Sequence, residues 1–299
     1  MKVVFMGTPD FALTALQKIA EKHEVVCVYT REPQLAGRGN KLTKSPVHQW
    51  AEQRGLLVRT PKTLRTADAQ EEYIALKADI AVVAAYGLIL PQVIIKAFPK
   101  GCLNIHGSLL PRWRGAAPIQ RAIEAGDDKS GITIMNIVPA LDAGSMLLKG
   151  EVPITAETTA ERLHDALAAL GADLIVRVLE NVDDFQRKAQ PQNEDFVTYA
   201  SKIDKQECKI DFSEKAEVLE RKIRAFNPYP AMYFEHKGER IKILSAQVCD
   251  ASGVAGTILE GKKALIIACG DKALSITEIQ RPGKRKMLIK DALNGYSFN

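Results

Sequence analysis

Three polar residues near the middle of the chain could carry chemistry together. Asn104 and His106 stand two positions apart, at the end of an apolar run over 102–105 that is typical of a β-strand. Side chains alternate along a strand with a period of two, so both residues point to the same side. Asp142 lies in a Leu-Asp-Ala-Gly motif after a later strand, and it could return to His106 to set its tautomer and charge.

This set of side chains suits the attack of an amine on a carbonyl carbon. The Asn104 amide can donate a hydrogen bond to the oxyanion of the tetrahedral intermediate. His106 can stabilise that oxyanion or move a proton between nitrogens, and a nearby carboxylate favours the charged imidazole. Taken alone, each motif also has a structural explanation, since Asn-x-His at a strand end often serves packing and Asp before Ala-Gly often serves a turn.

Alternating strand and helix patterns surround these residues. Ligands of an open α/β sheet bind at the carboxyl ends of its strands, where Asn104 and His106 stand. The sequence therefore predicts an α/β fold with a doubly wound, mostly parallel, Rossmann-like sheet. The expected strands cover 2–6, 25–29, 80–85, 102–105 and 131–137, with helices between them, including 45–54 and 66–77.

The pattern changes in the last third of the chain. A long helix over 159–182 is followed by a polar segment, 183–206, that is typical of a linker. A helix over 213–226, with Ser213 as its N-cap, then precedes five short strands that indicate a small, OB-like β-barrel. We predict a catalytic domain over 1–189, a linker over 190–206 and a C-terminal β-barrel domain over 207–299.

Composition narrows the class of protein. Hydrophobic residues make up 46% and charged residues 26%, no apolar run could span a membrane, and no signal-peptide pattern opens the chain, so we expect a cytoplasmic protein. The five cysteines are far apart and form no CxxC pair, which argues against disulfides and a zinc site, and none lies in the Asn104–His106 or Asp142 motif, which argues against a covalent thiol route. Gly7-Thr8-Pro9 lacks the GxGxxG pattern of a dinucleotide site.

The net charge of +5 is concentrated in the C-terminal part. Residues 206–299 hold 16 Lys and Arg against 12 Asp and Glu, whereas the preceding 205 residues hold 25 against 24. A basic second domain suits an anionic partner, although a merely solvated surface would look similar.

Seven longer sequence motifs are spread along the chain between residues 6 and 230. They are MGTPDFA (6–12), AGRGNKL (36–42), AYGLILP (85–91), NIHGSLLPRWRGAAPIQRAI (104–123), GITIM (131–135), LDAGSML (141–147) and RAFNPYP (224–230). Over essentially its whole length, the chain resembles the methionyl-tRNA formyltransferase family of folate-dependent formyltransferases. The resemblance implies transfer of the formyl group of 10-formyltetrahydrofolate to the amino group of initiator methionyl-tRNA for translation initiation, without a metal or a covalent intermediate.

The resemblance also implies roles for individual residues. The family's catalytic Asn, His and Asp fall on Asn104, His106 and Asp142. Its folate-contacting positions fall on Ser108, Leu109, Leu110 and Pro111 and on the segment that holds Tyr86, Gly87, Leu88 and Leu90.

Contacts with tRNA are implied by the resemblance for one region and suggested by charge for a second. The loop over 31–46 is expected to enter the acceptor arm, through Arg38, Lys41 and Lys44. A late basic cluster formed by Arg281, Lys284, Arg285, Lys286 and Lys290 suits phosphate contact, and a solvated face is the alternative. Arg112 and Arg114 could contact the folate tail or the tRNA end.

Other acceptors remain open at this point. A sugar-nucleotide amine, a glycinamide ribotide or water would keep the same formyl chemistry. The glycinamide enzymes generally lack a second domain such as 207–299, whereas the sugar-nucleotide enzymes share it. We expect a monomer, because nothing in the sequence requires a dimer.

Overall fold

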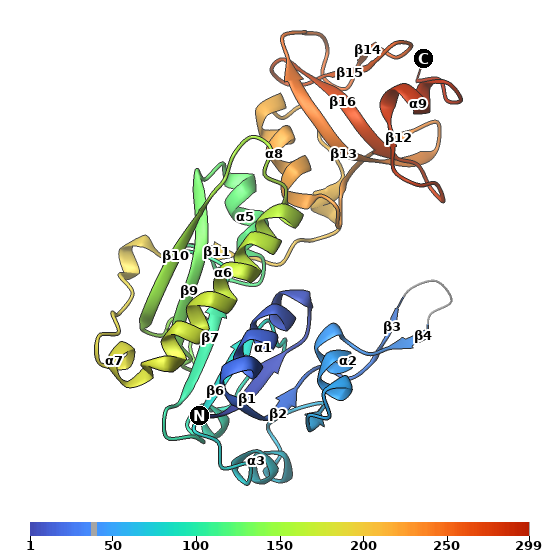
Figure 1. Ribbon diagram of the computed structural model, residues 1–299. Helices are drawn as coiled ribbons and strands as arrows, with labels where there is room; N and C mark the ends of the chain where they lie inside the picture. Colours follow the sequence, from blue (N-terminus) through green and yellow to red (C-terminus); the bar gives the residue numbers. More distant parts are fainter. Residues whose placement is uncertain (37–40, 299) are drawn as a thin grey trace. The chain divides into compact units, whose positions relative to one another are not determined.

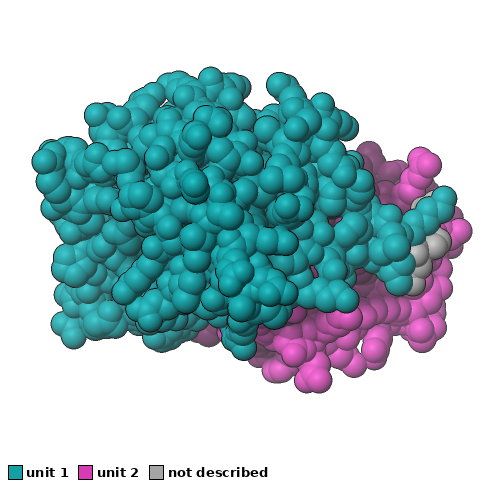
Figure 2. All heavy atoms as spheres, turned by 90° about the horizontal axis from the view of Figure 1, so that it is seen from below, with its two compact units in different colours: residues 1–115, 130–152, 164–199 teal, residues 116–129, 153–163, 200–299 magenta. Residues whose placement is uncertain are grey.

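The structure is a computed structural model that describes residues 1–36 and 41–298 (Figure 1). The chain forms two compact units. One holds residues 1–115, 130–152 and 164–199, and the other holds 116–129, 153–163 and 200–299 (Figure 2). Two internal segments thus group with the C-terminal part of the chain. The domain limits expected at 189 and 207 stay a prediction.

A seven-stranded sheet forms the centre of the first unit, in the order β10-β9-β7-β6-β1-β2-β5. β1 pairs in parallel with β2 and β6, β2 with β5, and β6 with β7, whereas β9 runs antiparallel to β7. The doubly wound, mostly parallel fold is confirmed. The strands are β1 Lys2–Gly7, β2 Glu24–Tyr29, β5 Val58–Arg59, β6 Ile80–Ala84, β7 Cys102–His106, β9 Lys129–Asn136 and β10 Met146–Pro153, and a short β8 covers Arg114–Gly115.

Helices lie along this sheet (Figure 1). Every residue of β6 is buried, as expected for a strand covered on both faces. The helices are α1 Asp10–Lys22, α2 Pro46–Gln53, α3 Ala67–Ile74, α4 Gln92–Ile95, α6 Ala160–Glu180 and α7 Val182–Arg187, with a 3₁₀ turn, η1, at Glu194–Phe196.

The two faces of β7 meet different neighbours. Cys102 belongs to a core cluster with side chains of α3 and α4. Ile105 points the other way, where α6 approaches so closely that a Cβ on Gly171 would lie 2.8 Å from the Ile105 side chain. Since side chains alternate along a strand, Asn104 and His106 share the Cys102 face.

A small hairpin extends from the loop after β2. Its strands, β3 (Gln34–Ala36) and β4 (Lys41–Thr43), pair antiparallel, with Leu35 opposite Leu42. Both leucine side chains are largely exposed.

The second unit is built on an antiparallel sheet in the order β12-β13-β16-β15-β14, with β17 beside β16. β12 and β14 stay at opposite edges, so the sheet is an open half-barrel. The elements of the second unit are α5 Pro118–Ala125, η2 Gln206–Cys208, α8 Ala216–Phe226, β12 Met232–His236, β13 Glu239–Cys249, β14 Ile258–Glu260, β15 Leu265–Ala268, β16 Ala273–Gln280, β17 Met287–Leu288 and α9 Ile289–Leu293. The short β11, Tyr199–Ala200, falls at the limit between the two units.

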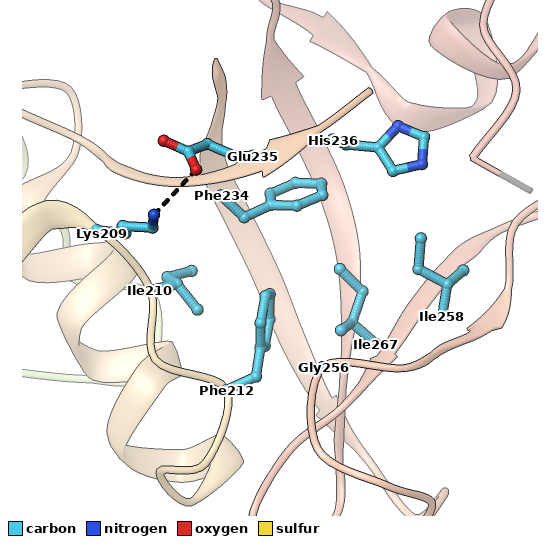
Figure 3. Close-up of a pocket in the computed structure, with 9 residues that line it drawn as sticks. All are labelled: Lys209, Ile210, Phe212, Phe234, Glu235, His236, Gly256, Ile258 and Ile267. Carbon is cyan, nitrogen blue, oxygen red and sulfur yellow. Dashed lines mark hydrogen bonds and ion pairs between the residues drawn. The ribbon is translucent and has the colours of Figure 1, made fainter. Parts of the chain in front are cut away.

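A cavity of about 280 Å³ lies where the half-barrel stays open (Figure 3). Phe234 of β12 and Ile258 of β14 line it together with Phe212. An ion pair between Lys209 and Glu235, 2.9 Å long, lies at its margin. The cavity thus exposes part of the apolar interior that a closed barrel would cover.

The start of α8 differs from the expectation. The helix begins at Ala216 with Lys215 in the N-cap position, so the prediction of Ser213 as the N-cap is wrong. The Ser213 hydroxyl and backbone N–H both donate to Oδ1 of Asp211, at 2.7 and 2.9 Å. A local Asx turn therefore uses the side chain that would otherwise cap the helix.

Candidate active site

His106 is held between two partners at the end of β7. Its ring Nε2 lies 2.9 Å from the carbonyl oxygen of Trp113, and its Nδ1 lies 3.7 Å from Oδ2 of Asp142. Because a carbonyl oxygen only accepts, Nε2 carries the proton of the neutral ring. Nδ1 is therefore the nitrogen that gains and loses a proton, opposite a carboxylate. The two side chains are 6% and 18% exposed, so water screens this pair weakly.

Asp142 is fixed in an uncommon conformation. Its φ of +46° lies in the left-handed region, and its Oδ2 accepts a hydrogen bond of 2.9 Å from the backbone N–H of Gly115. Two residues later, a Cβ on Gly144 would lie only 1.7 Å from the carbonyl oxygen of Asn136. Only glycine allows the loop to lie this close to β9, and this close approach helps to bring the carboxylate back to His106.

Asn104 and His106 thus share one face and one strand end, as the alternation predicts. Asn104 is partly exposed, whereas His106 is buried. The structure brings Asp142 to His106 and leaves the Asn104 amide on the same side of the strand. The three residues that the sequence singles out are therefore together, and their catalytic roles stay a prediction.

Most polar groups of the segment after His106 are hydrogen-bonded within the protein. Ser108 is buried, and its hydroxyl donates to the carbonyl of Arg112 at 2.6 Å. Thr133 donates to the Ser108 carbonyl at 2.7 Å and accepts from the N–H of Leu110 at 3.1 Å. Leu110 is also buried, so Leu109 and Pro111, which are partly exposed, offer the side-chain surface for a ligand.

The segment over 86–90 follows β6, the strand next to β7. Tyr86 is buried in the core cluster, and burial raises the pKa of its hydroxyl. Leu88 and Leu90 are partly buried against the same cluster. Gly87 is exposed, and its carbonyl accepts a 2.8 Å hydrogen bond from Arg31. The backbone and the leucines of this segment are therefore more accessible than the Tyr86 ring, and its contact with folate stays a prediction.

Comparison with known proteins decides the family. Residues 1–179 match the sequence pattern of the family described as Formyl transferase, and residues 202–297 match that of the Formyl transferase, C-terminal domain. The chain belongs to the formyl transferase family. The family expected from the motifs is confirmed.

Individual relatives of this formyl transferase cover its full length. The Methionyl-tRNA formyltransferase of Paramagnetospirillum magneticum is 52% identical over 300 residues, covering 100% of this chain and 98% of the relative. An N-formyltransferase from Helicobacter canadensis has a TM-score of 0.71 at 20% identity, covering 94% of this chain and 99% of that structure. HypX from Aquifex aeolicus has a TM-score of 0.66 at 18% identity, covering 98% of this chain. The chain spans 47% of HypX, and these two structures share its fold.

The predicted tRNA-contacting residues lie in and beside the β3–β4 hairpin. Arg38 lies outside the described residues. Lys41 is exposed on β4, whereas Lys44 forms an ion pair of 2.7 Å with Glu52 of α2. Glu52 also contacts His48 at 3.1 Å, so Lys44 braces the base of the hairpin against α2. The hydrogen bonds from Lys44 are the main cause of the lowered pKa of Glu52.

The predicted late basic cluster is in part neutralised within this formyl transferase. Arg281 makes a two-point ion pair with Glu239, at 2.7 and 2.9 Å, and stacks over the ring of Tyr296. Lys286 lies 3.9 Å from Glu278. Contact of this cluster with phosphates stays a prediction.

Gln192 supports the Asp142 loop, although the sequence pattern places it in the predicted linker and does not indicate this contact. Its side-chain amide contacts the Asp142 loop and Arg114. The Arg114 side chain is only 4% exposed and pairs with Glu194 at 2.8 Å, which does not favour the predicted contact of Arg114 with a ligand. A polar stretch without periodicity gave no signal for these contacts.

The described ranges, 1–36 and 41–298, hold neither a group of potential metal ligands nor a helix that could span a membrane. They contain no cluster of three or more His, Cys, Asp or Glu side chains arranged to hold a metal ion. Four of the five cysteines are buried. No helix in these ranges is both long and apolar enough to cross a membrane.

Proposed function

We propose that this protein transfers the formyl group of 10-formyltetrahydrofolate to the free amino group of methionyl-tRNA. The observation that carries the proposal is the His106–Asp142 pair at the end of β7 of a formyl transferase, with Asn104 two residues earlier on the same face of the strand. The full-length relative from Paramagnetospirillum magneticum, a Methionyl-tRNA formyltransferase, supports tRNA as the acceptor.

The chemistry needs one proton transfer and one stabilised oxyanion. The amine nitrogen attacks the formyl carbon, and a C–N bond forms while the carbonyl oxygen gains negative charge. The Asn104 amide donates a hydrogen bond to that oxygen. His106 accepts the amine proton at Nδ1 and returns it to the folate nitrogen as the old C–N bond breaks.

Asp142 and Trp113 make His106 suitable for this role. The Trp113 carbonyl holds the proton on Nε2, which leaves Nδ1 as the basic nitrogen. The Asp142 carboxylate, 3.7 Å from Nδ1, stabilises the imidazolium that forms while the proton is held. The products are formylated amine and tetrahydrofolate, with no change of oxidation state.

Charge favours a polyanionic acceptor over a small one. We propose that the C-terminal domain over 207–299, joined by the linker over 190–206 to the catalytic domain over 1–189, binds the tRNA. Residues 206–299 hold the excess of cations, and the loop over 31–46 adds Arg38 and Lys41, while Lys44 is paired with Glu52 at the base of the hairpin. We propose that the protein acts as a monomer in the cytoplasm. Light scattering of the purified protein measures its mass in solution and tests the monomer.

An amino sugar nucleotide is the second candidate acceptor. The structure from Helicobacter canadensis, an N-formyltransferase, was solved with folinic acid and dTDP-3-aminofucose. That protein shares the fold of this chain at 20% identity, so the fold alone does not choose between the two acceptors.

Transfer of labelled formyl separates these candidates. Radiolabelled 10-formyltetrahydrofolate is offered with charged initiator methionyl-tRNA, with an amino sugar nucleotide, and with no acceptor. We expect label on the tRNA alone, reduced by about 100- to 10,000-fold by His106→Ala. His164→Ala is the matched control, because His164 pairs with Asp165 on α6. Label on the sugar, or released as formate, would overturn the acceptor.

A further inference from the structure

Gln192 uses both ends of its side-chain amide beside the candidate active site. Its Nε2 donates to the backbone carbonyls of Asp142 and Gly144, at 2.7 and 2.9 Å. Its Oε1 accepts from Nε of Arg114 at 2.9 Å. One amide therefore ties the loop that carries the Asp142 carboxylate to the segment that carries Arg114.

Arg114 is itself a fixed anchor. Its side chain is buried, and its guanidinium donates to both carboxylate oxygens of Glu194, at 2.8 and 3.3 Å. The hydrogen bonds that Arg114 donates to Glu194 are the main reason why the Arg114 pKa is raised, so this anchor stays charged. Thr198 accepts from the backbone N–H groups of Trp113 and Arg114, each at 2.9 Å.

The backbone of segment 113–115 contacts both His106 and Asp142. The carbonyl of Trp113 faces Nε2 of His106, and the N–H of Gly115 donates to Oδ2 of Asp142. Arg114 lies between these two contacts in the chain. Anchoring its side chain therefore fixes the imidazole from one side and the carboxylate from the other.

The Asp142 loop needs such support. A non-glycine residue such as Asp142 is disfavoured at a positive φ, and surrounding contacts must hold it there. The Asp142 carbonyl is held by Gln192 and its carboxylate by Gly115. Without the Gln192 amide, the loop can relax, and the carboxylate can move away from Nδ1 of His106.

We propose that Gln192 is a positioning residue that sets the Asp142 carboxylate against His106 for formyl transfer. This inference rests on the proposed function, because it gives the pair a catalytic purpose. It adds to the machinery of the reaction a residue that lies outside all seven motifs that carry the family resemblance.

The test compares three variants. Gln192→Met keeps the length of the side chain and removes all three hydrogen bonds. Gln192→Glu keeps an acceptor for Arg114 but places a carboxylate oxygen against the carbonyls of Asp142 and Gly144. The matched control is Gln186→Met, because Gln186 donates a similar 2.7 Å hydrogen bond to the carbonyl of Lys100.

We expect both Gln192 variants to lower kcat by about 100-fold, the effect of misplacing a catalytic group by about 1 Å, with KM for folate and tRNA unchanged. Gln186→Met should keep the parent kcat even where it lowers Tm. Parent activity in Gln192→Glu would show that only the Arg114 contact matters and would overturn the proposal. A rise in KM with kcat unchanged would also overturn it.

Hydrogen exchange decides the structural half of the proposal without any activity measurement. Peptides that span 141–145, and the Gly115 amide, should exchange faster in Gln192→Met than in the parent or in Gln186→Met. Unchanged exchange would overturn the positioning role. If the parent transfers no formyl group at all, the proposed function fails, while the exchange result still decides whether Gln192 holds the loop.

Discussion

Replacing Asp142 with Asn removes one negative charge from the site and changes little else. The Asn side chain has nearly the same volume, and its Oδ1 can still accept the hydrogen bond that Gly115 donates. The loop should therefore keep its position. What changes is the electrostatic support for the positive charge that His106 carries while it holds the proton.

The size of the effect follows from the geometry. Two unit charges 3.7 Å apart attract by about 4.5 kcal/mol at an effective dielectric constant of about 20. The carboxylate supports the imidazolium only while the proton is transferred, so this energy is lost from the transition state. Since about 1.4 kcal/mol corresponds to a factor of ten in rate, we expect kcat to fall by about three orders of magnitude.

The assay is single-turnover transfer of labelled formyl from 10-formyltetrahydrofolate to methionyl-tRNA, with folate affinity and Tm measured in parallel. Asp183→Asn makes the same chemical change on an exposed side chain that pairs with Lys100, and it should leave kcat unchanged. A folded Asp142→Asn protein with kcat within about tenfold of the parent would refute the electrostatic argument, since about tenfold corresponds to only about 1.4 kcal/mol.

Two further predictions concern packing and thiol chemistry. Gly144→Ala places a Cβ 1.7 Å from the Asn136 carbonyl, so the loop must move by more than 1 Å. We expect kcat to fall by about 100-fold while folate affinity is kept. The control is Gly295→Ala, whose Cβ would have nothing within 4 Å and which should behave as the parent in the same assay. Burial raises the pKa of the Cys102 thiol to about 12, so this residue stays protonated and inert at pH 8. Iodoacetamide should therefore label the half-buried Cys249 first, and equal labelling of Cys102 in the folded protein, measured by mass spectrometry, would contradict this reasoning.

Much of the fold follows from local patterns. A strand such as 80–85 is apolar at every position, which only a strand covered on both faces explains, and it becomes β6. The contacts made by the first half of the predicted linker, 192–199, could not be predicted, because this stretch has no periodicity. Its residues contact a loop some 50 positions earlier in the chain, as Gln192 does with Asp142. Such contacts leave no local signal in composition or spacing.

The ligand segments show the same limit. Motif resemblance placed Tyr86 and Ser108 in a folate site, and sequence could not indicate how deeply either is buried. Tyr86 lies in the core beneath its segment, and the Ser108 hydroxyl is bound to the Arg112 carbonyl. Burial depends on the neighbours that the whole sheet brings together, and these are set by tertiary packing.

The strand end, the shared face of Asn104 and His106, and the family can all be predicted from the sequence, because alternation and motifs depend on neighbours along the chain. The basic nitrogen of His106 cannot, because it depends on folding, which places the Trp113 carbonyl at Nε2 and the Asp142 carboxylate near Nδ1. Folding also determines that Gln192 holds the Asp142 loop. These are contacts between distant segments, and their geometry exists only once the chain has folded.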